Sequence, residues 1–98
     1  MILTLGNKTA KDIWEGTESK ALPRELWIRA KALMTIMYNT DTIEDLKIQG
    51  QSPNIRLHKL KGGLKDYWSV TISLPWCIIF HFKNGNFSDV RIVNYHKG

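Results

Sequence analysis

The chain has 98 residues, which is enough to bury one hydrophobic core and too little for two, so we expect a single domain spanning residues 1–98. Apolar residues make up 43% of the composition, yet no stretch approaches the roughly 20 apolar residues of a membrane-spanning helix. The one cysteine, Cys77, excludes an internal disulfide and is typical of a protein in a reducing cytoplasm.

The net charge of +5 is concentrated in the C-terminal half. Residues 1–45 hold six basic and seven acidic side chains, whereas residues 46–98 hold eight basic and two acidic ones. The stretch 46–65 contains no acid and five basic residues, which are Lys47, Arg56, Lys59, Lys61 and Lys65. A one-sided basic surface attracts polyanions, but a cationic face that serves only solubility has the same composition. Charge alone leaves both interpretations open.

The first sixteen residues predict a strand and a helix. Residues 1–5 lack the basic flank and the length of a signal peptide, and we interpret them as a first strand. Asn7 is suited to cap a helix that runs to Trp14, because its side chain can accept a hydrogen bond from a free amide of the first turn. Gly16 is then the left-handed residue that ends this helix.

A second helix is predicted from Pro23, which suits the first position of a helix. Its apolar residues have helical spacing and comprise Leu26, Ala30, Leu33, Met34 and Met37. The helix is expected to end at residues 39–41. One short turn at 42–46 and a surface loop at 49–54 should follow.

From residue 55 onward the apolar period changes to two, which is typical of strands. A basic strand is expected to reach the bend at Gly62-Gly63, and further strands are predicted over 67–74 and 76–82, on either side of Pro75. Asn84-Gly85 predicts a type I′ hairpin turn before a last strand at 87–95. Two helices followed by consecutive strands predict an α+β fold. Both helices should pack on one face of a twisted, mainly antiparallel sheet and leave the other face free to carry function.

Two pairs of residues are suited to acid–base chemistry. His58 and Lys61 lie three residues apart at the end of the basic strand. A lysine offsets charge that develops at a phosphorus centre, and histidine exchanges a proton near neutral pH. Tyr95 and His96 follow the last strand and supply a phenol and a second imidazole. An ordinary exposed strand end and a frayed terminus contain the same residue types, so both interpretations stay open.

The other reactive side chains carry weaker signals. His81 alternates with Phe80 and Phe82, so we expect it on the opposite strand face, either as an edge histidine or as part of the basic surface. Cys77 lies in an apolar strand, which predicts an inert thiol. No histidines and acids have metal-ligand spacing, and there is no glycine-rich phosphate loop, so neither a metal nor a cofactor is expected.

Several segments, taken in order, resemble the HigB-type branch of the RelE/ParE toxin superfamily, the plasmid maintenance system killer proteins. They are 22–26, 42–46, Arg56-Leu57-His58-Lys59-Leu60-Lys61-Gly62, Tyr67-Trp68-Ser69-Val70, Asn84-Gly85 and Tyr95-His96. Each is a weak motif alone, and the specificity lies in their order and spacing within a chain of this length. The resemblance runs over nearly the whole chain and is weakest before Gly16.

This resemblance implies a microbial RNase-like fold and the toxin of a type II toxin–antitoxin system. Such a toxin inhibits translation by cleaving mRNA on the ribosome, as an endoribonuclease that needs no metal or cofactor. The implied partners are a helix-turn-helix antitoxin of the HigA kind, the ribosome and mRNA. Operator DNA would be contacted only through the antitoxin, and no membrane is involved.

Carried over residue by residue, the catalytic positions are His58, Lys61, Tyr95 and His96. RNA cleavage through its own 2′-hydroxyl needs a base, a cation near the phosphorus and an acid for the 5′-oxygen. We hypothesise that His96 handles the leaving-group proton, Lys61 stabilises charge, and His58 or Tyr95 orients or assists. The ring of Tyr95 is also suited to stack on an exposed base. The expected RNA-binding residues are Arg56, Lys59, Lys65, His81 and Arg91.

Two substitutions remove a charged group of the family pattern, and Leu64 and His81 also stand where the family commonly has a basic residue. Asn94 stands where the family has aspartate, and Cys77 stands where it has arginine, which removes a carboxylate and a guanidinium. His81 lies four residues from Cys77, hence on the same strand face, where we expect it to replace part of the missing charge. The loss of one catalytic hydrogen-bond donor costs about 10²–10³ in rate. The alternatives are therefore a homologue that binds RNA, ribosome or antitoxin without cleavage, and a ParE-like gyrase inhibitor.

Overall fold

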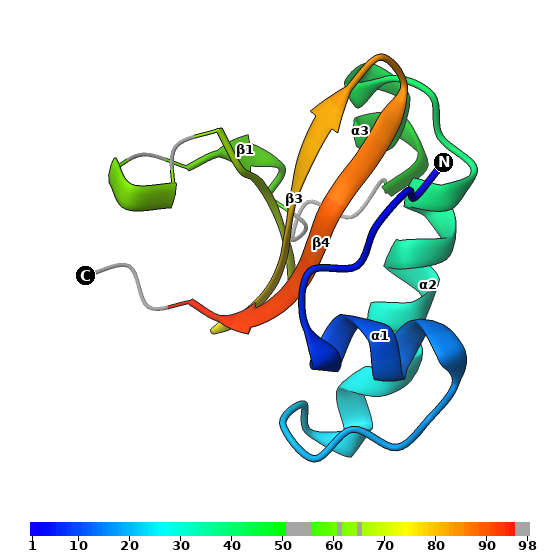
Figure 1. Ribbon diagram of the computed structural model, residues 1–98, viewed down its shortest axis with the longest axis vertical. Coiled ribbons are helices and arrows are strands. Elements are labelled where there is room, and N and C mark those ends of the chain that lie inside the picture. The colour runs from blue at the N-terminus through cyan, green and yellow to red at the C-terminus, as the bar shows by residue number, and fades with distance from the viewer. Residues whose placement is uncertain (51–55, 61, 65, 96–98) are drawn as a thin grey trace.

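The computed structural model describes residues 1–50, 56–60, 62–64 and 66–95, with the backbone alone at 47–50 and 64. Three α-helices, α1 (Lys8–Glu15), α2 (Trp27–Tyr38) and α3 (Ile43–Gly50), lie on the same side of a curved sheet (Figure 1). The sheet has the order β1-β2-β3-β4, and all neighbouring strands are antiparallel. Its strands are β1 (His58–Lys59), β2 (Trp68–Ser73), β3 (Trp76–Lys83) and β4 (Asn86–Asn94). The prediction of an α+β fold is confirmed.

The first helix begins and ends where the sequence predicts. The Asn7 side chain accepts a hydrogen bond from the backbone amide of Ala10 at 3.0 Å, and Gly16 adopts a left-handed conformation with φ of 76°. The Asn7 side chain also bonds to β4, because its amide donates to the carbonyl of Ile92 at 2.9 Å and its oxygen accepts from the amide of Ile92. One cap residue therefore both starts α1 and fastens that helix to the sheet.

The second helix starts later than predicted. Pro23 has an extended ψ of 137° and precedes a short 3₁₀ helix, η1 (Arg24–Leu26), so α2 begins only at Trp27. The apolar stripe nevertheless faces the core, where Ala30, Leu33, Met34 and Met37 are buried and Leu26 is half-buried.

The prediction of one short turn at 42–46 is wrong. The Thr42 hydroxyl accepts a hydrogen bond from the Asp45 amide at 3.0 Å, which caps a full helix, α3. Residues 49 and 50 of the expected loop belong to α3, and the rest of it, 51–54, lies outside the described residues.

The sheet is shorter at its first edge than the sequence indicates. The expected basic strand is reduced to the two residues of β1, and a 3₁₀ helix, η2 (Gly62–Leu64), occupies the position of the expected glycine bend. The hairpin between β3 and β4 is confirmed, since Asn84 and Gly85 have φ of 53° and 80°, as a type I′ turn requires.

The N-terminal segment is not a regular strand. Residues 1–6 run beside β4 (Figure 1), where Ile2 and Leu5 form isolated parallel bridges with Phe87 and Val90. The pairing of this segment with β4 is interrupted by a bulge in β4. Ile79 pairs with Arg91 and His81 with Ser88, so a step of two residues in β3 corresponds to three residues in β4.

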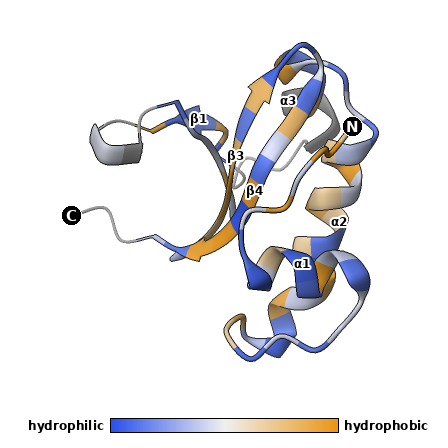
Figure 2. Ribbon diagram, viewed as in Figure 1, coloured by the Kyte–Doolittle hydropathy of each residue, from blue (hydrophilic) through white to orange (hydrophobic). Residues whose placement is uncertain are grey.

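The core lies between the helices and the sheet. Its sheet residues are Val70, Ile72, Ile78, Phe80, Phe87, Val90 and Ile92, all at most 2% exposed. They alternate with residues of the opposite face, and Figure 2 shows this as bands of hydrophobic and hydrophilic colour along β3 and β4. The core therefore fixes which residues point away from the helices.

Candidate functional site

The sheet face turned away from the helices, here called the outer face, collects most of the described candidate residues. One row of ladder partners crosses all four strands and consists of His58, Ser69, Ile79 and Arg91. Directly opposed residues of an antiparallel ladder point to the same side. The next residues along β2 and β3, Val70 and Ile78, point into the core, which assigns the row to the outer face.

The centre of the outer face is not free, contrary to the prediction. Ser69, Thr71, Cys77 and Ile79 are all at most 5% exposed. The sheet curves strongly in Figure 1, and we attribute this burial to the flanking strands of a concave face. These four positions therefore offer no exposed polar group, and the described candidate residues lie around them.

His58 is an exposed residue at this rim, and its ring orientation is defined by a local contact. Its Nδ1 atom lies at hydrogen-bond distance from the backbone carbonyl of Arg56. A carbonyl only accepts, so this contact is a hydrogen bond in the tautomer that carries a proton on Nδ1, and Nε2 is then the ring nitrogen that can accept a proton.

Tyr95 lies at the opposite corner of the same face. Its backbone amide donates to the carbonyl of Pro75 at 2.9 Å, which extends the pairing of β3 and β4 by one step beyond Asn94. Strand alternation then places Tyr95 on the side of Val93 and Arg91, the outer face. His96, Lys61 and Lys65 lie outside the described residues.

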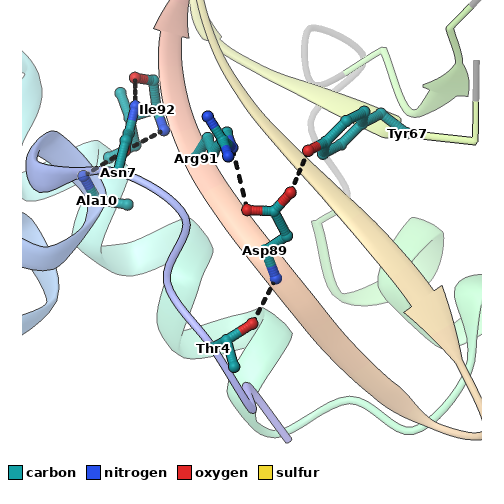
Figure 3. A network of polar contacts seen from close by, with 7 residues as sticks. All are labelled: Thr4, Asn7, Ala10, Tyr67, Asp89, Arg91 and Ile92. Atoms are coloured by element: carbon teal, nitrogen blue, oxygen red, sulfur yellow. Dashed lines mark hydrogen bonds and ion pairs between the residues drawn. The ribbon is translucent and has the colours of Figure 1, made fainter. Parts of the chain in front are cut away.

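A polar network occupies the outer face at the bulge of β4 (Figure 3). The Tyr67 hydroxyl donates to one carboxylate oxygen of Asp89, and Nε of Arg91 donates to the other at 3.0 Å. The ring of Tyr67 stacks on His81, with 4.1 Å between ring centroids. Residues from β3, from β4 and from the position just before β2 are therefore fixed in one cluster of aromatic, acidic and basic groups.

This network shifts the proton affinities of its members. The hydrogen bond from Tyr67 lowers the pKa of Asp89, assisted by Arg91, so the carboxylate is ionised at neutral pH. Burial, together with the adjacent carboxylate, raises the pKa of Tyr67 and keeps its hydroxyl protonated. The pKa of Arg91 is raised by its hydrogen bond to Asp89. The cluster holds one ion pair and one neutral phenol.

The bulge of β4 is what makes this network possible. Asp89 has a φ of 50°, and its amide, removed from the ladder, bonds to the Thr4 hydroxyl at 2.7 Å. Gly6 completes the fit, since a Cβ atom there would lie 2.0 Å from Oδ1 of Asp89 and 2.7 Å from Nε of Arg91. The N-terminal segment therefore packs closely against the carboxylate only because residue 6 has no side chain.

The predicted RNA-binding residues do not all share this face. Arg56 is exposed just before β1, while His81 and Arg91 are held in the network. Lys59 pairs with Trp68 and lies over its ring at 5.5 Å, which places it on the helix side of the sheet edge. Lys59 is therefore separated from the other described candidates.

The two departures from the family pattern lie on opposite faces. Cys77 pairs with Thr71 and Val93 on the outer face, whereas Asn94 pairs with Trp76, which packs against the core. His81 shares the face of Cys77, as expected, but four residues separate them by about 13 Å along the strand. His81 therefore lies beside Tyr67 and not at the position where an arginine at residue 77 would leave the backbone.

Sequence reasoning missed two members of the site, Tyr67 and Asp89. In the sequence, the signal for Tyr67 was its place in the Tyr-Trp-Ser-Val motif, and Asp89 was an acid two residues before Arg91. Nothing in the pattern indicated a bulge at Asp89. Within the described part of the chain, no three His, Cys, Asp or Glu side chains gather as a metal site requires.

A helical layer on one face of a four-stranded antiparallel sheet, with imidazole, phenol and guanidinium groups on the other, is the arrangement expected of a RelE-like toxin. A family model described as "RelE-like toxin of type II toxin-antitoxin system HigB" matches residues 6–96. The match covers most of the chain, so the chain belongs to this family of HigB-type toxins.

A relative, Endoribonuclease HigB of Proteus vulgaris, is 48% identical over 40 residues. The matched segment covers 41% of this chain and only 40% of the relative's length. None of the helices in the described ranges has the length and apolar character needed to cross a membrane.

Proposed function

We propose that this chain is a ribosome-dependent mRNA endonuclease that inhibits translation in the cytoplasm and is neutralised by a HigA-like antitoxin. Family membership supports the toxin class and an antitoxin partner, and the printed name of the relative supports RNA cleavage. The single observation that carries the catalytic part is the position of His58, which is exposed at the rim of the concave outer face with its Nδ1 atom against the carbonyl of Arg56.

The proposed reaction needs no group beyond side chains and RNA. A base removes the proton of a 2′-hydroxyl, the 2′-oxygen attacks the adjacent phosphorus, and the bond to the 5′-oxygen breaks as an acid protonates that oxygen. The products are a 2′,3′-cyclic phosphate and a 5′-hydroxyl. Of the described residues, His58 is the one to which we assign the first proton transfer, through Nε2.

The remaining roles follow the family pattern. Lys61 would stabilise the charge on the phosphorane-like state, and His96 would protonate the leaving oxygen. Tyr95, at the far corner of the outer face, would stack on a base of the bound strand. Arg91 has terminal amines that its bond to Asp89 through Nε leaves available for a phosphate.

Primer extension on a defined mRNA, with purified protein and programmed ribosomes, tests this function. We expect cuts that require ribosomes and that fall about 10²–10⁴-fold in rate on His58→Ala or His96→Ala, the range for loss of a general acid or base. Antitoxin binding should be unchanged in both variants, which separates lost chemistry from lost folding.

A specific observation favours one second candidate, a homologue that binds without cutting. The outer face has a buried thiol, Cys77, where the resemblance implies a guanidinium. An absence of cuts by folded, antitoxin-free protein would support this candidate. Cuts that persist in both histidine variants would contradict the proposed chemistry, and DNA-damage signalling without RNA cleavage would point to a gyrase inhibitor.

A further inference from the structure

A second cationic site lies beside the outer face, at the edge of β2. β1 extends along β2 only as far as Ser69. Beyond that point a pocket of about 540 Å³ opens between β2 and the start of α2. Arg29 of α2 and Arg56 from the segment before β1 both line it, together with Thr71 and Ser73.

The two guanidinium groups have no acidic partner among the residues that the structure describes. None of the residues that line the pocket is acidic, and neither arginine forms an ion pair with any residue in the described ranges. Nε of Arg29 donates to the backbone carbonyl of Ile72, which fixes the plane of that guanidinium and leaves its terminal amines available. A guanidinium fixed in this way is suited to the oxygens of a phosphate or carboxylate.

The pocket lies within one nucleotide of the proposed catalytic base. Thr71 in its wall is two residues along β2 from Ser69, the ladder partner of His58, and two strand residues span about 7 Å. Leu74, 63% exposed, forms part of the same wall and offers an apolar contact for a ribose or base.

We propose that this Arg29–Arg56 pocket binds a phosphodiester of single-stranded RNA next to the one held at His58. The inference rests on the proposed function, because it assumes that an RNA strand crosses the outer face. The alternative anion that could bind in this pocket is a carboxylate from an acidic segment of the antitoxin. RNA is favoured because the pocket adjoins His58 and both arginines are unpaired cations within the described residues.

Binding of a short, single-stranded RNA with 2′-O-methyl groups, which resist cleavage, tests the pocket as salt is raised. Wild-type protein is compared with Arg56→Gln and with Lys83→Gln. Both substitutions remove one positive charge, but Lys83 is exposed at the end of β3 far from Ser73. Arg56→Gln should lower affinity about fivefold to tenfold at low salt and make the slope of log K against log salt shallower by about 0.7.

Lys83→Gln should leave both the affinity and the slope near the wild-type values. Arg29→Lys, which retains the charge but loses the planar fork, should also weaken RNA binding, with its melting temperature as the check on folding. Equal affinity and slope for Arg56→Gln and Lys83→Gln would overturn the inference, as would undetectable RNA binding by the wild type at low salt. Weaker antitoxin binding by Arg56→Gln with unchanged RNA binding would assign the pocket to an acidic partner instead.

These outcomes are distinguishable from failure of the proposed function. If the wild type cuts ribosome-bound mRNA while Arg56→Gln binds RNA normally, only the pocket inference is wrong. If Arg56→Gln weakens RNA binding as expected while no variant cuts, the pocket inference is upheld and the proposed cleavage is wrong.

Discussion

Replacement of Tyr67 by phenylalanine removes one hydrogen bond and leaves the stacked ring in place. The lost bond runs from the Tyr67 hydroxyl to an ionised carboxylate, that of Asp89. Hydrogen bonds to charged groups contribute about 1.5–3 kcal/mol when buried, and the 30% exposure of the Asp89 side chain reduces this. We therefore expect Tyr67→Phe to lower the free energy of unfolding at pH 7 by about 1–2 kcal/mol.

The pH dependence of this loss has a defined sign. Because the pKa of Asp89 is lowered in the folded protein, its carboxylate contributes stability above the unfolded pKa of about 3.9. That contribution is lost as the pH falls through the lower folded value. The difference between wild type and Tyr67→Phe should thus be largest at neutral pH and shrink in acid, as the carboxylate becomes protonated.

Urea unfolding at pH 7 and at acidic pH measures the difference in stability between wild type and Tyr67→Phe. In a chain of this size the melting temperature should fall by about 4–8 °C for each kcal/mol lost. Tyr38→Phe is the matched control, because Tyr38 packs its ring on Trp14 and its hydroxyl has no partner among the described residues. Equal effects of the two substitutions, or a Tyr67→Phe loss that does not depend on pH, would refute the network as a source of stability.

Two further substitutions test how the N-terminal segment is attached to the sheet. Gly6→Ala should lower the free energy of unfolding, measured in urea, by about 1–3 kcal/mol, because the new Cβ would lie 2.0 Å from Oδ1 of Asp89. This loss should be smaller in a protein that also carries Asp89→Ala. An unchanged loss there would exclude the clash as its cause. Asn7→Ala should cost about 2–3 kcal/mol, since it removes both a helix cap and two bonds to Ile92. Thr42→Ala, which removes only a helix cap, should lower the free energy of unfolding by about 1 kcal/mol. An equal loss in Asn7→Ala and Thr42→Ala would mean that the bonds from Asn7 to β4 contribute nothing.

Local signals in the sequence were reliable where the chemistry itself is local. Asn7 and Gly16 mark the ends of α1, and Asn84-Gly85 marks the hairpin, because each conformation depends on one or two residues and their own backbone. The alternation along β3 also predicted that His81 points away from Phe80 and Phe82, and the core contains Phe80 with Phe82 packed against it. These features were enough to predict the α+β class, whereas the resemblance to HigB-type toxins depends on the order and spacing of short motifs.

Predictions failed where a neighbour distant in the sequence decides the outcome. Residues 1–5 have the composition of a strand, but their ladder is broken by a bulge on β4, more than 80 positions away. The outer face was expected to be open, yet the curvature of the sheet buries Ile79 and Cys77. Neither the bulge nor the curvature has a signal in the segment that it affects.

The caps of α1, the hairpin and the basic character of the C-terminal half could all be predicted from the amino-acid sequence. Only the tertiary structure joined Tyr67, His81, Asp89 and Arg91 into one network, and only it placed Arg29 beside Arg56. The physical reason is the range of the forces involved. Backbone conformation and amphipathic period depend on adjacent residues, whereas hydrogen bonds, ring stacking and charge pairing depend on distances that the register of strands fixes after the chain has folded.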